Sequence, residues 1–434
     1  MTGGPKDGAP RPHPDAYDLA RWGGAVSRTA RTDAGGWAPD RDGVHQIALT
    51  EEQPLDILVQ GLDRLDRPGR ERVILVCLSG AVAGRNGEKA PFFSGARLAQ
   101  ILDVPLIAPS DPSLALEPTL ALGWYAGHEG ATDLPQVLAT VIDAAARTHG
   151  ARLLVAGGSG GGFAALLLAR LLNARADILI WNPQTKIENY FPRFVKHYLR
   201  VAFPSRHTYD QLTSALGHET LRAALSASGV SHTVCQSSPL RRNISIIYMQ
   251  NIHDLHVEKH TIPFMNELSF QRYSGNVFNE NNSYIYIYFG LWGEGHVPPP
   301  QAVLVTILKW MLAGATPALV AQGLARGREN VAPVLPDYDP FAPETPLRVS
   351  VTALRRDGQV HARASVLPTP RAGVTFAFYL IRDGQREAMR WYRPEPEASF
   401  DIPEAPGRLS VRAFARDRDG ATTIVSAPVA DEAP

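Results

Sequence analysis

Short apolar runs alternate with helix-like segments through the first three quarters of the chain. The runs are rich in β-branched residues and bounded by turn formers, which predicts strands. They lie at 55–59, 73–78, 105–108, 152–156, 177–181, 244–250 and 284–289. Helical periodicity falls between them, at 95–102, 134–149, 163–172 and 302–312. Strands that alternate with helices predict βαβ units and a mostly parallel, doubly wound sheet that is buried on both faces.

Three segments depart from this rhythm. Residues 1–44 are polar and rich in Pro and Gly, which predicts a flexible N-terminal segment. Residues 186–239 carry aromatic and basic side chains and predict a helical insertion in an α/β domain that spans 45–330. Residues 331–346 hold five prolines, a composition typical of an interdomain linker.

Beyond the linker the period of the pattern changes to two, over residues 347–434. Asp-Gly pairs at Asp357, Asp383 and Asp419 supply hairpin turns between the alternating runs. The strands that this pattern predicts are 347–353, 360–366, 374–382, 387–392 and 409–416. We expect an all-β, immunoglobulin-like sandwich that has no cysteine and therefore no disulfide between its sheets.

Composition narrows the class of protein. The 434 residues are 44% hydrophobic and 20% charged, and 43 basic residues balance 43 acidic ones. This balance gives no general reason to expect a nucleic-acid partner. Cys77 and Cys235 are the two cysteines, too few for a disulfide framework. Because the chain shows neither a signal peptide nor a long apolar span, we expect a cytoplasmic protein without a membrane segment, and its oligomeric state is left open.

The strongest motif is Gly157-Gly158-Ser159-Gly160-Gly161, between a predicted strand and a predicted helix. In a nucleophile elbow the serine occupies a strained turn, so its neighbours must be very small. The alternative is a glycine-rich loop that binds phosphate. A dinucleotide-binding loop would follow the first strand of the domain, whereas this one follows a later strand, and no Walker lysine follows it. We therefore predict that Ser159 is a nucleophile.

Two partners follow in the expected order, each just after a strand. Asp254 comes after the run at 244–250, and His296 follows the run at 284–289 in a glycine-flanked loop. His296 would be the base that takes the serine proton, and Asp254 the acid that orients it. Glu294 is a weaker rival for the acid.

Asp254 lies among further candidate metal ligands. They are His253, His256, Glu258 and His260. Their spacing is not that of H-E-x-x-H, so we expect no metal, and a metal site remains the less favoured alternative. His256 and His260 could equally support the site from behind or belong to the core.

An acyl-transfer site also needs an oxyanion hole and a pocket. The Gly160 N–H lies at a helix N-terminus, and Gly80 and Ala81 follow the strand at 73–78, so these are the expected oxyanion donors. Residues after other strands are expected to line the pocket, although a simple turn is an equal alternative for the first three. They are Asp111, Trp124, Tyr125, Asn182, Gln184 and His256.

With these motifs the chain resembles the α/β-hydrolase superfamily over about residues 45–315. A narrower resemblance is to bacterial α/β-hydrolase-fold proteins of capsule and surface-polysaccharide synthesis, including capsule O-acetyltransferases. It rests on Ser110-Asp111-Pro112-Ser113-Leu114, Trp124-Tyr125-x-Gly127, Trp181-Asn182-Pro183-Gln184-Thr185 and Gln250-Asn251-x-x-Asp254. The resemblance implies acyl transfer to or from a sugar through an acyl-Ser159 intermediate.

Three functions are therefore open. The first is an esterase that acts on an acylated carbohydrate or a small ester, without a cofactor. The second is an O-acetyltransferase that uses acetyl-CoA as cosubstrate. The cations of the insertion could bind a CoA phosphate or an anionic glycan, although a solvated charged face is the favoured interpretation; they are Lys186, Arg193, Lys196 and Arg200. The third is a non-catalytic binding protein, which the presence of all three predicted catalytic residues disfavours.

Overall fold

The computed structural model describes residues 10–431, apart from 68–70, 83, 86, 208–216, 236–242, 275, 281–283, 326–347, 368–373, 403–405 and 417–421. The predicted linker at 331–346 and the predicted Asp419-Gly420 turn lie outside the described residues.

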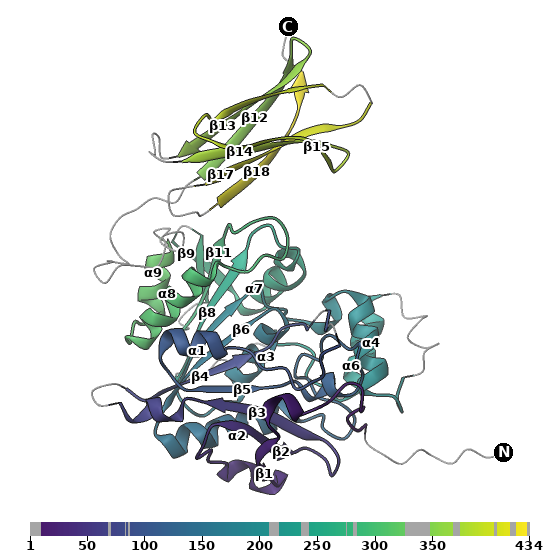
Figure 1. The fold of residues 1–434 in the computed structure, drawn as a ribbon, viewed down its shortest axis with the longest axis vertical. Coiled ribbons are helices and arrows are strands. Elements are labelled where there is room, and N and C mark those ends of the chain that lie inside the picture. Colours follow the sequence, from purple (N-terminus) through teal and green to yellow (C-terminus); the bar gives the residue numbers. More distant parts are fainter. Residues whose placement is uncertain are drawn as a thin grey trace, which may run out of the picture.

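A large sheet forms the centre of the first part of the chain (Figure 1). Its central strands run parallel to one another, and they are β4 (Val73–Leu78), β5 (Leu106–Pro109), β6 (Arg152–Gly158), β7 (Ala176–Trp181), β8 (Ile244–Asn251) and β11 (Ile285–Gly290). The flanking strands are β1 (Ala25–Thr29), β2 (Gly43–Ala48), β3 (Pro54–Gln60), β9 (Phe270–Ser274) and β10 (Val277–Glu280). Across the sheet the order is β1-β2-β3-β5-β4-β6-β7-β8-β11-β10-β9, with β3 antiparallel to both its neighbours.

Both faces of the parallel strands are covered by helices. Successive side chains of a strand point to opposite faces, so Ile74 and Val76 of β4 join one hydrophobic core while Leu75 and Cys77 join the other. The first core is completed by α2 (Leu134–His149) and α3 (Gly160–Leu171), and the second by α1 (Ala96–Leu102), α8 (Gln301–Leu312) and α9 (Pro317–Ala325). This doubly wound, mostly parallel sheet confirms the predicted α/β-hydrolase fold class.

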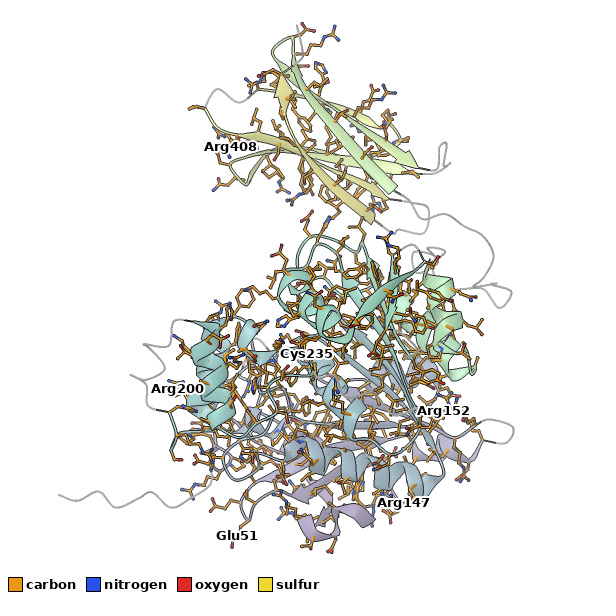
Figure 2. All side chains as sticks on the ribbon, turned by 180° about the vertical axis from the view of Figure 1, so that it is seen from behind. Glu51, Arg147, Arg152, Arg200, Cys235 and Arg408 are labelled. Carbon is orange, nitrogen blue, oxygen red and sulfur yellow. The ribbon has the colours of Figure 1, made fainter. Side chains whose placement is uncertain are left out.

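Arg152, labelled in Figure 2, fastens the amino-terminal end of the central strand β6. Its side chain is buried at the start of β6 and donates to Glu71 at 2.6 Å, to Asp177 at 3.0 Å and to the carbonyl oxygens at the end of α8. A buried cation is tolerated when it is paired in this way. Arg152 therefore connects α8 to the amino-terminal ends of the strands, and Ser159 lies at their carboxyl-terminal ends.

The N-terminal segment differs from the flexible stretch expected over residues 1–44. From residue 10 onward it is ordered against the sheet: β1 pairs with β2, and Trp37 is buried in the first core. The Tyr17 hydroxyl also donates to the Asp56 carboxylate at 3.1 Å. The Pro/Gly-rich composition of the segment predicts flexibility. It does not reveal that an isolated apolar residue such as Trp37 is buried in the hydrophobic core.

The segment at 186–239 contains helices, as predicted: α4 (Pro192–Ala202) and α6 (His218–Ala227). Its buried residues include Tyr198 and Leu199. Between this segment and residue 325 the structure contains four elements that the sequence did not predict, namely α7 (Ile262–Leu268), β9, β10 and α9. The strand β9 is largely exposed and has no apolar run from which to recognise it.

The C-terminal part is a β-sandwich of two four-stranded sheets, as predicted. One sheet has the order β16-β13-β12-β19, with β12 (Arg348–Arg356), β13 (Gln359–Leu367), β16 (Glu397–Asp401) and β19 (Ala430–Asp431). The other has the order β15-β14-β17-β18, with β14 (Thr375–Arg382), β15 (Gln385–Arg393), β17 (Leu409–Arg416) and β18 (Thr422–Pro428). The turns at Asp357-Gly358 and Asp383-Gly384 have positive φ at both residues, which is the geometry that an Asp-Gly hairpin turn requires.

The structure also shows the state of the cysteines and the character of the helices. Cys77 and Cys235 are both buried and free. Within the described part of the chain, the helices are all too short or too polar to cross a membrane.

Candidate active site

Ser159 lies at the sharp turn between β6 and α3. Its backbone has φ 54° and ψ −119°, an unfavourable conformation for a residue with a side chain, at a cost on the order of 1–3 kcal/mol. A Cβ on Gly157 would lie 2.5 Å from the Gly161 oxygen, and one on Gly161 would lie 2.3 Å from the Leu78 oxygen. The glycines are therefore needed for a strand–turn–helix geometry that presents Ser159 at the edge of the sheet.

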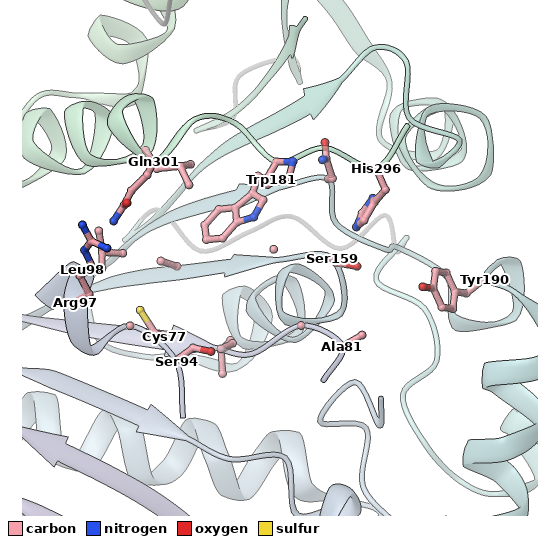
Figure 3. A pocket seen from close by; sticks show the side chains of 18 residues that line it. Cys77, Ala81, Ser94, Arg97, Leu98, Ser159, Trp181, Tyr190, His296 and Gln301 are labelled. Atoms are coloured by element: carbon pink, nitrogen blue, oxygen red, sulfur yellow. The ribbon is translucent and has the colours of Figure 1, made fainter. Parts of the chain in front are cut away.

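Asp254 and His296 lie in the loops that follow two neighbouring strands, β8 and β11. The His296 Nδ1 donates to the Asp254 Oδ2 at 2.6 Å, and the Asp254 side chain is completely buried. A carboxylate at Nδ1 keeps the proton there, which leaves Nε2 as the base. Ser159 and His296 line one pocket, and Figure 3 shows the His296 ring pointing toward Ser159.

The rival acid, Glu294, has a different partner. Its Oε1 lies 3.3 Å from the Nδ1 of His253, and both side chains are well exposed. Of the two acids considered, Asp254 is therefore the one that contacts His296.

The His296 loop is held by two buried asparagines. The Asn251 amide donates to the Gly293 and Gly295 carbonyl oxygens at 2.9 and 2.7 Å. The Asn182 amide donates to the Val297 oxygen at 2.8 Å, and its own oxygen accepts from the Asn251 N–H at 2.7 Å. These bonds fix the backbone on both sides of His296. We had not predicted this role for Asn251, although an amide directly after a strand was a signal for it.

Gln184 contacts the Ser159 hydroxyl directly. Its Nε2 donates to the Ser159 Oγ at 3.2 Å, and its Oε1 accepts from the Trp124 indole N–H. Gln184 is fully buried. Trp124 thus fixes the orientation of the amide, and the amide holds the Ser159 hydroxyl.

The loop after β4 lies close to the elbow. A Cβ on Gly80 would lie 3.1 Å from the Gly158 oxygen, and Gly80 and Ala81 both line the pocket with Ser159. Gly160 is the first residue of α3, where the N–H has no partner within the helix. The three predicted oxyanion donors, Gly80, Ala81 and Gly160, therefore lie beside Ser159.

Of the six side chains predicted to line the pocket, Asn182 is among the lining residues, and the other five lie outside that lining. Asp111 is buried, where its carboxylate accepts from the backbone N–H groups of Ser113 and Tyr125 at 3.0 and 2.8 Å. This burial raises the pKa of Asp111. The Tyr125 hydroxyl accepts from the Ser79 N–H at 3.0 Å. These groups hold the loops in place from behind the pocket.

His256 also lies behind the pocket, with its ring centroid 4.4 Å from that of His296 and its Nδ1 2.9 Å from the Asn182 oxygen. Burial lowers the pKa of His256 to about 4, and it lowers that of His260 well below the usual value. Both imidazoles are therefore neutral at neutral pH.

Of the predicted candidate metal ligands, Asp254 and His256 lie together with His296, and the ligand atoms of these three residues lie within 4.8 Å of one another. Two ligands on a tetrahedral zinc ion stand about 3.3 Å apart, given metal–ligand bonds near 2 Å. The 2.6 Å between Asp254 and His296 is instead a hydrogen-bond distance. This contact fits an oriented base better than a metal centre.

The pocket beside Ser159 has a volume of about 580 Å³. Much of its lining is apolar, and the side chains that provide this surface include Leu78, Leu98, Ala156, Trp181, Pro298 and Leu304. Cys77 also contributes, but burial raises the pKa of its thiol to about 12, so it is no competing nucleophile.

Three cations of the insertion have partners. Lys186 pairs with Glu267 at 2.6 Å, and Arg200 pairs with Glu117 at 3.2 Å. The Arg193 guanidinium stacks 4.8 Å from the centre of the Phe194 ring. These contacts give the cations structural roles that need no bound phosphate.

No protein-family model and no curated protein matches the sequence. Several solved structures are similar in fold. A bottromycin epimerase shares 13% identity with a TM-score of 0.34, over 64% of this chain and 100% of its own. A peroxisomal alpha-beta-hydrolase from Saccharomyces cerevisiae shares 11% identity with a TM-score of 0.32, over 64% of this chain and 86% of its own.

An esterase from Pyrococcus furiosus is similar as well, at 11% identity and a TM-score of 0.36, over 64% of this chain and 93% of its own. Likenesses of this size carry no information about substrate or mechanism. The narrower resemblance to capsule-associated acetyltransferases stays a prediction.

Proposed function

We propose that this protein is a serine ester hydrolase that works through an acyl intermediate on Ser159, with an acylated carbohydrate or a small ester as substrate. The observation that carries the proposal is the hydrogen bond of 2.6 Å between the His296 Nδ1 and the buried Asp254 carboxylate. His296 lines the same pocket as Ser159, whose backbone conformation is strained.

In the first half-reaction the Ser159 Oγ attacks the ester carbonyl carbon while the His296 Nε2 takes the hydroxyl proton. The N–H groups of Gly160 and of the Gly80-Ala81 loop receive the negative charge on the carbonyl oxygen. When the tetrahedral intermediate collapses, the C–O bond to the alcohol breaks and His296 returns the proton to the departing oxygen. Asp254 stabilises the imidazolium throughout.

In the second half-reaction water attacks the acyl-Ser159 carbonyl, and His296 takes a proton from that water. Collapse breaks the bond to the Ser159 Oγ, which receives the proton, and the carboxylic acid leaves. Gln184 holds the Ser159 hydroxyl in the resting site, so its hydrogen bond must yield as the oxygen attacks.

Intact-mass spectrometry after brief incubation with p-nitrophenyl acetate tests the proposal. We expect one acetyl adduct on the wild-type protein that disappears in water and maps to Ser159, and none on Ser159→Ala. The variant Ser226→Ala, which alters an exposed serine of α6, should label like the wild type.

Acetyl-CoA serves as a second donor in the same experiment. An adduct from acetyl-CoA that persists until a sugar is added would move the assignment to an O-acetyltransferase. No adduct from either donor on the folded protein would contradict the proposed chemistry.

A further inference from the structure

The pocket extends well beyond the atoms that the proposed reaction needs. Figure 3 shows Arg97, Leu98 and Gln301 at one end, Tyr190 at the other, and Ser159 and His296 between them. Because His296 must reach the departing oxygen, we assign the Tyr190 side to the leaving group and the longer arm, toward Arg97, to the acyl group.

The length of this arm follows from the strand register. Cys77 of β4 lies opposite Ala156 of β6, and Gly95, which precedes α1, packs directly against the Cys77 side chain. Ala156 is three residues before Ser159, so at about 3.3 Å per residue the arm reaches roughly 10 Å from the nucleophile before Arg97 begins. An acetyl group would leave most of it empty.

The arm has apolar walls and a charged side chain at its end. Its walls are apolar, formed by side chains such as Leu98, Trp181 and Leu304. At its end stands Arg97, which is exposed and, within the described part of the chain, forms no ion pair. The described residues that line the pocket include no Asp or Glu. By contrast, Arg152 and Arg200 both have carboxylate partners.

An unpaired guanidinium at the end of an apolar channel is suited to a carboxylate, which it can bind through two parallel hydrogen bonds. The Gln301 amide lies at the same end of the pocket and offers a further donor (Figure 3).

We infer that the site selects esters whose acyl chain is apolar along its length and ends in a carboxylate, which Arg97 binds with help from Gln301. The inference rests on the proposed function for the position of the ester. The position of the anionic end is a property of the pocket itself.

The kinetic test compares two p-nitrophenyl esters of equal chain length, mono-p-nitrophenyl suberate and p-nitrophenyl octanoate. We expect the ratio of their kcat/KM values to fall about tenfold in Arg97→Gln, mainly through KM for the suberate, and to fall with added salt in the wild type. Arg97→Lys should retain part of the preference. The control is Arg147→Gln, which removes an exposed charge from α2 and should leave the ratio unchanged.

A binding test does not depend on turnover. In the Ser159→Ala background, calorimetry measures monomethyl suberate against methyl octanoate, with and without Arg97→Gln. We expect the arginine substitution to weaken suberate binding about tenfold relative to octanoate.

The outcomes separate the two proposals. Hydrolysis of both esters with a ratio that Arg97→Gln does not change would overturn the inference and leave the proposed function standing. Binding selectivity that depends on Arg97, without hydrolysis of either ester, would overturn the proposed function and support the inference. Neither hydrolysis nor selective binding would overturn both.

Discussion

The α/β region and the β-sandwich differ in the kind of side chain that they bury. Among the described residues, every buried polar or charged side chain except Thr423 belongs to the α/β region. The sandwich core is apolar, and it includes Phe376, Phe378 and Leu380 of β14, which lie beside residues such as Val411 of the neighbouring strand β17.

This difference is instructive because burying a polar group costs several kcal/mol unless it is fully hydrogen-bonded. In the α/β region several of these groups gather where strands β7 and β8 end, and they include Asn182, Gln184, Asn251, Asp254 and His256. Each is bonded to the Ser159 turn, to the His296 loop or to a residue that holds them. At these strand ends the buried polar side chains hold the Ser159 turn and the His296 loop, whereas the described core of the sandwich is held by apolar packing.

The largest effect should come from the buried carboxylate. Asp254→Asn replaces the carboxylate that keeps the His296 proton on Nδ1 with a neutral amide whose NH₂ group favours the other tautomer, so we expect kcat for p-nitrophenyl acetate to fall on the order of 10³–10⁴-fold. Glu294→Gln is the matched control, since Glu294 contacts His253, and it should stay within a few-fold of the wild type. The opposite result would reassign the acid.

In the sandwich the largest effect should be on stability. Phe378 is 1% exposed in the apolar core, and Phe378→Ala should lower the free energy of unfolding of the sandwich by about 3–5 kcal/mol, measured by calorimetry. Trp391→Ala is the control, because Trp391 is 61% exposed on β15, and it should change stability by less than about 0.5 kcal/mol. Loss of esterase activity in Phe378→Ala below its unfolding temperature would break the comparison between the two regions.

A smaller effect is expected from the loop that carries the base. Asn251→Ala removes the amide that binds the Gly293 and Gly295 oxygens, and we expect the rate of Ser159 acylation to fall about 10–100-fold. Stopped-flow kinetics measures it. The control is Asn243→Ala, since Asn243 precedes β8 at the opposite edge of the sheet and its amide also binds two carbonyl oxygens. Equal losses of activity in both variants would mean that Asn251 acts only through stability.

The smallest effect concerns pH. Burial raises the pKa of Asp56 from its usual 3.8 to about 6. The folded state therefore binds more protons than the unfolded state between these two pH values. The contribution of Asp56 to the free energy of unfolding is complete below pH 4 and is lost as the pH rises through 6. We expect Asp56→Asn to stabilise the protein at pH 8 by on the order of 1–2 kcal/mol, measured by urea unfolding.

His256 acts in the opposite sense. Its pKa is lowered to about 4, so its contribution to stability increases as the pH rises from 4 to 6.5. In Asp56→Asn the free energy of unfolding should therefore rise with pH over this range. In the wild type the opposite effect of Asp56 partly cancels this rise. Asp63→Asn, which alters an exposed acid just beyond the end of β3, should show the wild-type profile. A profile for Asp56→Asn that falls over this range would contradict both assignments.

Much of the fold could be predicted from local patterns. The strand at 73–78 and the helix at 134–149 appear with the predicted bounds, because a buried strand or an amphipathic helix records its environment in its own residues. By contrast, β1 has an exposed, mixed pattern, and Trp37 is an isolated apolar residue whose burial depends on distant strands. These are the places where the N-terminal prediction differed from the structure.

The candidate site divides in the same way. Ser159, Asp254 and His296 were identified because each follows a strand in a fixed order along the chain. Asp111, Trp124 and Tyr125 also follow strands, but their side chains point into the structure behind the pocket. A position after a strand places the backbone at the edge of the sheet without fixing the direction of the side chain.

By itself, then, the sequence determined the alternation of strands and helices, the period-two sandwich and the glycines that the Ser159 turn requires. Those features depend on residues a few positions apart, whose spacing is visible in the chain. Only the tertiary structure decided that Asn182 and Asn251 hold the His296 loop and that Arg97 and Gln301 line the same end of the pocket. These contacts join residues that are far apart in the chain, and they form only when the sheet and its helices pack.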